Sequence, residues 1–532
     1  MFVKFADDNS PGDPVVDYRK WPLYDDPARL PESAPFFLSP SPDAPFVDST
    51  LTAYFFEQSN GRMVLFGNVY PRTIVSSGPE ADYHRPRGGY GALATEVIHR
   101  LDDVGLDFSE YDFNKDGRVD HIFLIIRNDT EKMSGRITWT GASCLDARCA
   151  NGPPVGKYIE PLRVDNVLVD WNLSGSILFN RVPGNIIPHY WLIRMMAHEI
   201  GHDFWARFFI HVPAITTNDV PAESNYRPPT NVLGYVLMAG AGGGRDARGD
   251  ETISAWERSL LGWIDCPVLS SSESGVRLRD LYTSGDCRRI QIGEPKRERT
   301  LFLSNRQRIG AFDRIRRGGN DGRFDMGLLR TTGLLVGLSD RNRYEVLPAD
   351  NSLELALDNA SYAGDLFGPG SRSQLTPWTR PTSNGYSERR PASGGSWAAI
   401  DNIRSDADDP EVMLFDFVED FRTRPIIRED SWMAAESANQ EIDAPLVITD
   451  GATLTVSTEL TLDGRVRVDP GAVLHISRNA TLNLGPRSTL SLDEGSELRI
   501  DGRLNVAGVV TPRAGSTVVR GRTGRVEARI TR

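Results

Sequence analysis

The C-terminal segment, residues 444–532, repeats pairs of apolar residues separated by one residue. Successive pairs begin six or eight residues apart, and Asp-Gly, Pro-Gly, Gly-Pro or Glu-Gly stands at most of the corners. Strands this short, with one apolar face, bury that face only by stacking on similar strands. The repeat therefore predicts a β-solenoid, with a meander of hairpins as the alternative. The pairs are Leu454/Val456, Leu460/Leu462, Val466/Val468, Leu474/Ile476, Leu482/Leu484, Leu490/Leu492, Leu498/Ile500 and Leu504/Val506.

The rest of the chain divides into segments with different secondary-structure patterns. Residues 1–265 alternate strand and helix patterns, which predicts an α/β domain with a buried strand at His121–Arg127 and a helix over Gly91–Val104. Residues 266–421 carry short strand patterns between Gly, Asp, Asn and Pro, which predicts an all-β, sandwich-like accessory domain. We expect residues 422–443 to be a linker or a short connecting helix between this domain and the solenoid. The solenoid offers no catalytic pattern, so the roles we expect for it are those of a stalk, a spacer or a surface for docking to cells.

Charge and hydropathy exclude two classes of partner. The net charge is -12 at pH 7, and no basic cluster with interleaved aromatics counters it, which argues against nucleic acid. No apolar run is long enough to cross a membrane.

The four cysteines fall into two sequence-local pairs, Cys144/Cys149 and Cys266/Cys287. This distribution predicts two disulfides and a secreted, extracellular protein, whereas four thiols in a cytoplasmic protein are the alternative. The opening residues Met1–Asp8 read as a strand and not as a signal peptide, so we expect that the native leader is absent from this chain.

The pentapeptide HEIGH, residues 198–202, carries the strongest chemical signal. On a helix, residues four apart share a face, so His198 and His202 can offer two imidazoles to one ion. Glu199 then lies beside that ion, where its carboxylate can take a proton from water. No proline interrupts the apolar stretch between Pro188 and Pro213, and burying these ionisable groups without a purpose is costly. The motif predicts a zinc site with Glu199 as general base.

A second motif, DFNKDGRVD at residues 112–120, has oxygen-bearing side chains at positions 1, 3, 5 and 9 and a glycine at position 6. This spacing lets a loop surround one hard cation, although the glutamate at position 12 of the helical calcium hand is missing. We expect structural calcium, and a polar turn held by its own side chains is the alternative. The expected ligands are Asp112, Asn114, Asp116, Asp120 and the carbonyl oxygen of Arg118.

Two further segments follow the HEIGH stretch. GYVLMAG, residues 234–240, contains Met238, which is either an ordinary core methionine or the methionine turn that forms a floor beneath a zinc site. SAWERSLLGW, residues 254–263, reads as an amphipathic helix that closes the domain.

In this order, the motifs resemble those of the immune inhibitor A family of secreted bacterial zinc metallopeptidases. The resemblance covers roughly residues 1–420 and also includes FADD at 5–8, LTAYFFEQS at 51–59, HEIGHD at 198–203, LSNRQ at 303–307 and GLLV at 333–336. It implies a zincin-type, metzincin-like catalytic domain that hydrolyses peptide bonds of protein or peptide substrates. It further implies that His198 and His202 bind zinc, that Glu199 is the base, that Met238 lies in the methionine turn, and that a leader and propeptide precede the mature enzyme.

One departure from the family pattern concerns the third zinc ligand. In the family a glycine breaks the helix three residues after the second histidine, and an aspartate three residues further on is the third ligand. Here these positions hold Trp205, which prolongs the helix, and Phe208, which has no lone pair. The candidates to replace the ligand are Asp219 and His211, then Glu223 and Glu257. The alternative to an active peptidase is a catalytically impaired peptidase-fold scaffold or adhesin that binds a surface through its β domains.

Overall fold

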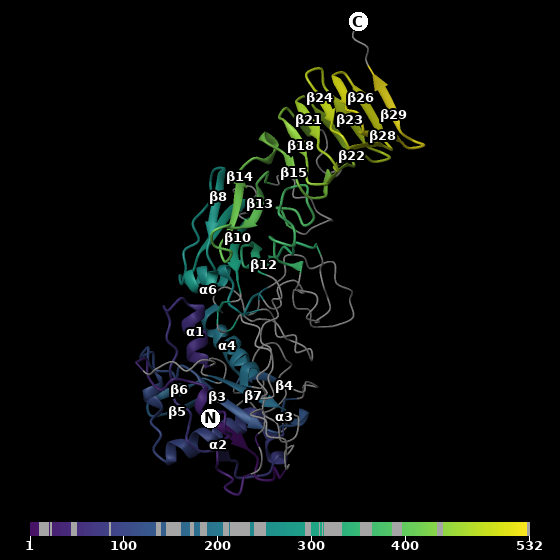
Figure 1. Ribbon diagram of the computed structural model, residues 1–532. Helices are drawn as coiled ribbons and strands as arrows, with labels where there is room; N and C mark the ends of the chain where they lie inside the picture. The colour runs from purple at the N-terminus through teal and green to yellow at the C-terminus, as the bar shows by residue number, and fades with distance from the viewer. Residues whose placement is uncertain are drawn as a thin grey trace.

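The computed structural model places an α/β region at one end of the molecule, an all-β region in the middle and a solenoid at the other end (Figure 1). The described residues are 1–9, 21, 24–43, 50–84, 87–134, 140–144, 161–170, 175–180, 189–205, 212, 235–238, 252–292, 299–307, 309–310, 312, 332–351, 364–385, 396–433 and 440–528. None of the helices formed by these residues is long and apolar enough to cross a membrane.

The N-terminal region is built on one mixed sheet with the strand order β2-β1-β3-β7-β4. Its first four strands pair in parallel, and β4 closes one edge in the antiparallel direction. The strands are β1 (Phe2–Lys4), β2 (Ile74–Val75), β3 (Ile122–Arg127), β4 (Thr140–Cys144) and β7 (Gly175–Asn180). The expected strand at His121–Arg127 is β3, whose residues are nearly all buried.

Helices cover both faces of this sheet, because alternate side chains of each strand point to opposite sides. Phe2, Ile125 and Leu178 share a core with α1 (Leu51–Gln58) and α4 (His189–Trp205). Their chain neighbours Val3, Leu124 and Ile177 share another core with α2 (Gly89–Asp103), the helix expected over residues 91–104. Shorter elements are α3 (Glu131–Ser134), β5 (Leu162–Val164), β6 (Val167–Val169) and the 3-10 helices Ala34–Phe36, Glu80–Tyr83 and Phe108–Tyr111.

The middle region consists of two antiparallel sheets, ordered β12-β11-β10-β9 and β13-β14-β8. Apolar residues of both sheets form one core, as expected for an all-β sandwich-like domain. The strands are β8 (Glu273–Leu278), β9 (Cys287–Ile292), β10 (Arg299–Arg306), β11 (Gly333–Asp340), β12 (Arg343–Val346), β13 (Ala399–Ser405) and β14 (Met413–Val418).

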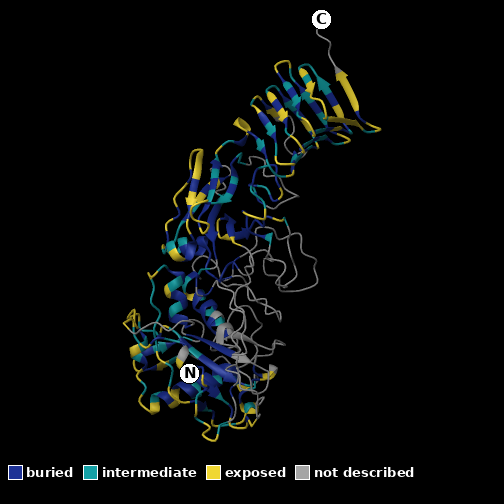
Figure 2. Ribbon diagram, viewed as in Figure 1, coloured by how far each residue is buried: buried dark blue, intermediate teal, exposed yellow. Residues whose placement is uncertain are grey.

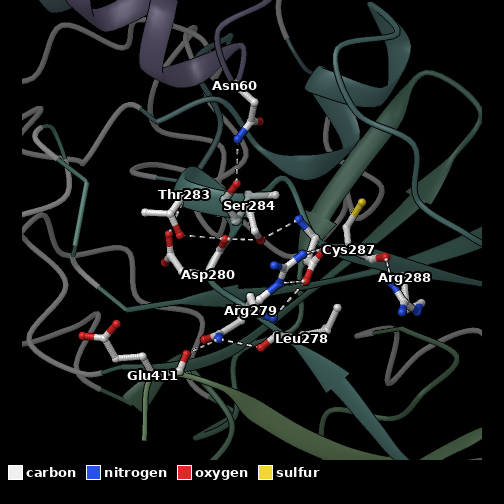
Figure 3. Close-up of polar contacts among 12 residues, drawn as sticks. Asn60, Leu278, Arg279, Asp280, Thr283, Ser284, Cys287, Arg288 and Glu411 are labelled. Atoms are coloured by element: carbon white, nitrogen blue, oxygen red, sulfur yellow. Dashed lines mark hydrogen bonds and ion pairs between the residues drawn. The ribbon is translucent and has the colours of Figure 1, made fainter. Parts of the chain in front are cut away.

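Two short helices join the α/β and all-β regions. In α5 (Ala255–Leu260), Trp256 stacks on Tyr344 of β12 with ring centroids 4.9 Å apart. Figure 3 shows Asn60 pointing at α6 (Leu281–Ser284), where its amide donates to the Tyr282 carbonyl oxygen at 2.9 Å. A disulfide between Cys266 and Cys287 ties the segment after α5 to β9. This is one of the two expected disulfides; Cys149 of the other lies outside the described residues.

The C-terminal region is a β-solenoid, as the repeat predicts, in which the described residues form three parallel five-stranded sheets. Equivalent residues stack in register, so that Leu474 lies between Leu454 and Leu498, all fully or almost fully buried. Figure 2 shows buried residues alternating with intermediate or exposed ones along the strands. The sheets are β15 (Ile426–Ile427), β18 (Leu446–Ile448), β21 (Arg465–Val468), β24 (Thr489–Leu492), β27 (Val509–Pro512); β16 (Ser431–Met433), β19 (Thr453–Val456), β22 (Val473–Ile476), β25 (Glu497–Ile500), β28 (Thr517–Arg520); and β17 (Gln440–Ile442), β20 (Glu459–Leu462), β23 (Thr481–Leu484), β26 (Arg503–Val506), β29 (Arg525–Ala528).

The solenoid begins earlier than predicted, because residues 422–443, expected to be a linker, contain β15, β16 and β17. These strands pair in parallel with the next coil. In β16 and β17, Ser431 and Gln440 stand opposite Leu454 and Leu460 of the next coil, so the paired apolar pattern is missing, although Ile427, Met433 and Ile442 are buried. Trp378 and Phe421 of the preceding region join the same core and cover this end of the solenoid.

Candidate metal centre

Helix α4 brings three side chains of the HEIGH motif close together. The potential ligand atoms of His198, Glu199 and His202 all lie within 4.8 Å of one another. Among the described parts of the chain, no other group of three or more His, Cys, Asp or Glu side chains is this close. The two imidazole rings are perpendicular, at an interplanar angle of 89°, with centroids 5.1 Å apart. One turn of the helix thus brings two nitrogen ligands and a carboxylate close to one another.

A backbone contact determines which nitrogen of His198 can bind a metal. Nδ1 of this buried ring lies 2.7 Å from the carbonyl oxygen of Leu237. A carbonyl oxygen only accepts hydrogen bonds, so Nδ1 carries a proton, and in the neutral ring Nε2 then carries the lone pair. Histidines that bind metals in proteins are commonly held in this way through their other ring nitrogen.

Met238 follows Leu237 and contacts α4 between the two histidines. A Cβ atom placed on Gly201 would lie only 2.2 Å from the sulfur of Met238, so this helix position accepts no side chain without a shift. Met238 is fully buried. The glycine, which weakens a helix interior, is therefore explained by the close approach of the methionine. This contact places Met238 directly against the HEIGH turn of the helix.

The backbone around Met238 is held by Glu257 of α5. One carboxylate oxygen of Glu257 accepts from the Met238 amide at 3.0 Å, and the other accepts from the Leu237 amide at 3.2 Å. The second oxygen also accepts from the amide and hydroxyl of Ser254, at 2.9 and 3.0 Å, which completes a capping box. Glu257 is fully buried, and burial raises its pKa to about 7 despite the opposing effect of these hydrogen bonds.

Glu257 is therefore not arranged as a zinc ligand, which corrects its place among the candidates for the third ligand. Its two oxygens are directed at backbone amides and at Ser254, and it is absent from the close group on α4. The capping-box spacing of Ser254 and Glu257 was visible in the sequence. Its bonds to Leu237 and Met238 were not, because they join segments about twenty residues apart.

The other candidates for the third ligand, Asp219, His211 and Glu223, lie outside the described residues, as does Phe208. Trp205 is helical, as predicted, and its buried indole donates to the Glu257 carbonyl oxygen at 3.2 Å. Val212, the chain neighbour of His211, donates its amide to the Met238 carbonyl oxygen at 2.8 Å.

The DFNKDGRVD loop is held by hydrogen bonds from its own backbone. Asp112 accepts from the amides of Asp116 and Gly117 at 3.0 Å, and Asp120 accepts from Phe113 at 2.9 Å. Similar bonds join the Asn114 side chain to the Asp116 amide and the Asp116 side chain to the Arg118 amide, each at 2.9 Å. The Arg118 guanidinium donates to Asp170 at 2.7 Å. These are the bonds of the polar-turn interpretation, and they leave further lone pairs on each carboxylate.

The loop also lies near the end of α4, a connection that sequence reasoning missed. Nδ1 of His121, directly after the loop, lies 3.0 Å from a carboxylate oxygen of Asp203, directly after His202. Burial raises the pKa of Asp120, and the negative charges of Asp112, Asp116 and Asp203 raise it further against the Phe113 hydrogen bond. The loop and the HEIGH helix therefore share one electrostatic environment.

Comparison of the sequence with models of protein families and with curated proteins finds no match.

Proposed function

We propose that this chain is a zinc-dependent endopeptidase that hydrolyses peptide bonds of protein substrates. One observation carries the proposal: His198, Glu199 and His202 place their ligand atoms within 4.8 Å of one another on one helix. The order of motifs, which resembles that of secreted bacterial zinc metallopeptidases, supports the same function.

The chemistry of the donor set fits zinc. Two neutral imidazoles suit zinc, whereas calcium and magnesium prefer oxygen ligands. The hydrogen bond from His198 to the Leu237 carbonyl supports binding through Nε2. When bound, zinc supplies a Lewis acid that polarises a carbonyl group and lowers the pKa of water.

The remaining steps belong to the protein's own side chains. Glu199, which is partly exposed, takes the proton from the attacking water and passes it to the leaving amine. His198 and His202 hold the ion, and Met238 supports the helix between them.

A third protein ligand completes the site, and we propose that His211 or Asp219 supplies it. His211 is the first candidate to test, because its chain neighbour Val212 forms a backbone hydrogen bond to Met238, which packs against the HEIGH helix. Loss of zinc in His211→Ala but not in Asp219→Ala would assign the ligand to His211, and the reverse result would assign it to Asp219.

We also propose that the loop of residues 112–120 binds calcium as a structural ion. The oxygen spacing favours a bound cation, and so does the environment of Asp120, whose pKa is raised by burial first and then by the negative charges of Asp112, Asp116 and Asp203. Calcium there would stabilise β3, and through the contact of His121 with Asp203 it would stabilise the end of α4.

The wider setting that we propose is extracellular. The disulfide between Cys266 and Cys287 supports an oxidising compartment. The solenoid, whose outward residues are largely polar, would then act as a spacer that docks the enzyme to a cell surface.

The test is to replace Glu199 by glutamine in the whole chain. The variant should keep stoichiometric zinc after dialysis. Its rate of hydrolysis of fluorescein-labelled casein should be at least about a hundredfold lower than that of the wild type. The matched control is Glu441→Gln, an exposed glutamate in the solenoid, which should change neither quantity. Unchanged hydrolysis in Glu199→Gln would remove Glu199 as the base, and a wild type without zinc would favour a scaffold or adhesin.

A further inference from the structure

Helix α5 contacts both the all-β region and the α/β region. Trp256 stacks on Tyr344 at an interplanar angle of 6°. Arg258, which is fully buried, donates to the Gln58 side chain of α1 at 2.8 Å and to the Ile253 carbonyl oxygen at 2.8 Å. The residue between them, Glu257, is thus held by neighbours that contact both regions of the molecule.

The Glu257 carboxylate of α5 bonds to Leu237, the residue whose carbonyl group orients His198. Leu237 donates its amide to Glu257 at 3.2 Å and accepts from Nδ1 of His198 at 2.7 Å through its carbonyl group. Met238, whose amide also donates to Glu257, packs against Gly201. The Met238 N–H and the Leu237 carbonyl form one peptide group, so a chain of hydrogen bonds runs from Glu257 through this group to the ring of His198. Such chains polarise one another and hold each member in place.

The hydrogen-bond donors around Glu257 match the acceptor sites of an ionised carboxylate. Four donors converge on Glu257: the amides of Leu237, Met238 and Ser254 and the hydroxyl of Ser254. An ionised carboxylate has only acceptor sites, whereas the amide of a glutamine would direct its own N–H groups at one of these donors. Isosteric replacement would therefore displace the turn without changing the size of the side chain.

We infer that Glu257 is a positioning residue of the proposed zinc site, which acts through the Leu237–Met238 peptide group to hold His198 in the tautomer that presents Nε2. The inference rests on the proposed function, because it assigns a role to Glu257 in that same site. It separates Glu257 from the residues that would contact the ion.

The test compares Glu257→Gln with Ser254→Ala in the whole chain. Ser254→Ala removes the hydroxyl of the capping box but leaves the carboxylate and its bonds to Leu237 and Met238. Both variants should lower the unfolding temperature. We expect zinc binding, measured by competition with a chelator, to weaken at least about tenfold in Glu257→Gln only. The turnover number for a peptide substrate should fall in that variant with an unchanged KM, because substrate-binding surfaces are untouched.

A second measurement needs neither zinc nor activity. In the metal-free wild type labelled with nitrogen-15 histidine, NMR should show His198 with its proton on Nδ1. In Glu257→Gln this preference should decrease, and Glu257→Asp, which keeps the charge, should restore part of it. The asparagine variant Glu257→Asn extends the comparison, with no restoration expected. Should Glu257→Gln fail to fold, the aspartate and asparagine variants carry both measurements.

The outcomes distinguish a failure of the role inferred for Glu257 from a failure of the proposed zinc peptidase function. A wild type that binds zinc together with a glutamine variant that binds it equally tightly, with His198 unchanged, overturns the inference alone. Equal weakening in Ser254→Ala also overturns it, because the effect would then come from the cap. A wild type that retains no zinc overturns the proposed function and the inference together.

Discussion

In the solenoid, the position of a residue in the repeat determines its neighbours, and Leu474 simply lies between Leu454 and Leu498. Around the candidate metal centre, contacts join distant segments: His198 bonds to Leu237, and Leu237 bonds to Glu257. The first arrangement sums interactions between adjacent coils. The second is a single network in which one change affects several members. The effect of a substitution should therefore stay within adjacent coils of the solenoid, whereas a substitution near the metal centre should affect several residues of the network.

The largest effect on stability should come from Leu474→Ala. Removing this fully buried side chain should cost about 2–5 kcal/mol of local unfolding free energy, because a cavity remains between adjacent coils. Hydrogen exchange should show the loss in β19, β22 and β25, with zinc affinity unchanged. Weaker zinc binding in this variant would break the proposed independence of the two regions.

Glu257, in the network around the metal centre, should make the free energy of unfolding depend on pH. Burial raises the pKa of this group from 4.5 to about 7, so between these values the folded state binds more protons than the unfolded state. The free energy of unfolding should fall as pH rises through this window, by at most about 3 kcal/mol from this group. Urea denaturation of the wild type and Glu257→Gln at a series of pH values measures the difference. Parallel profiles would show that Glu257 does not titrate there.

Gly201→Ala should destabilise the N-terminal region by about 1–3 kcal/mol, because the new methyl group collides with the sulfur of Met238. In a Met238→Ala background, the same substitution should cost much less. A double-mutant cycle from urea denaturation gives the coupling. Additive effects would mean that the helix and the methionine do not constrain each other.

The smallest effect should come from Asp203→Asn, which weakens the contact with His121. The pair is only partly buried, so we expect a loss of about 1 kcal/mol. The loss should disappear in a His121→Ala background, where the contact is already gone. A full loss in that background would show that Asp203 acts through another group.

The elements that the sequence predicted well are those with a strong local period. The paired apolar positions located β19 to β26, and the continuous apolar run located β3, because each pattern reports which face is buried. The segment 422–443 was misread because Ser431 and Gln440 stand where the next coil has leucine. In the site, the helical spacing of His198 and His202 was sufficient to group them. The role of Glu257 was not predictable, since a capping box does not reveal what else its carboxylate bonds.

The sequence alone determined the stacking of the solenoid and the grouping of His198, Glu199 and His202, since both depend on spacing within one element. Only the tertiary structure decided the tautomer of His198, the need for glycine at position 201 and the partners of Glu257. Each of these depends on how segments separated in the chain meet. Hydrogen-bond partners and steric limits across such contacts are set by the packed core, and not by the local sequence.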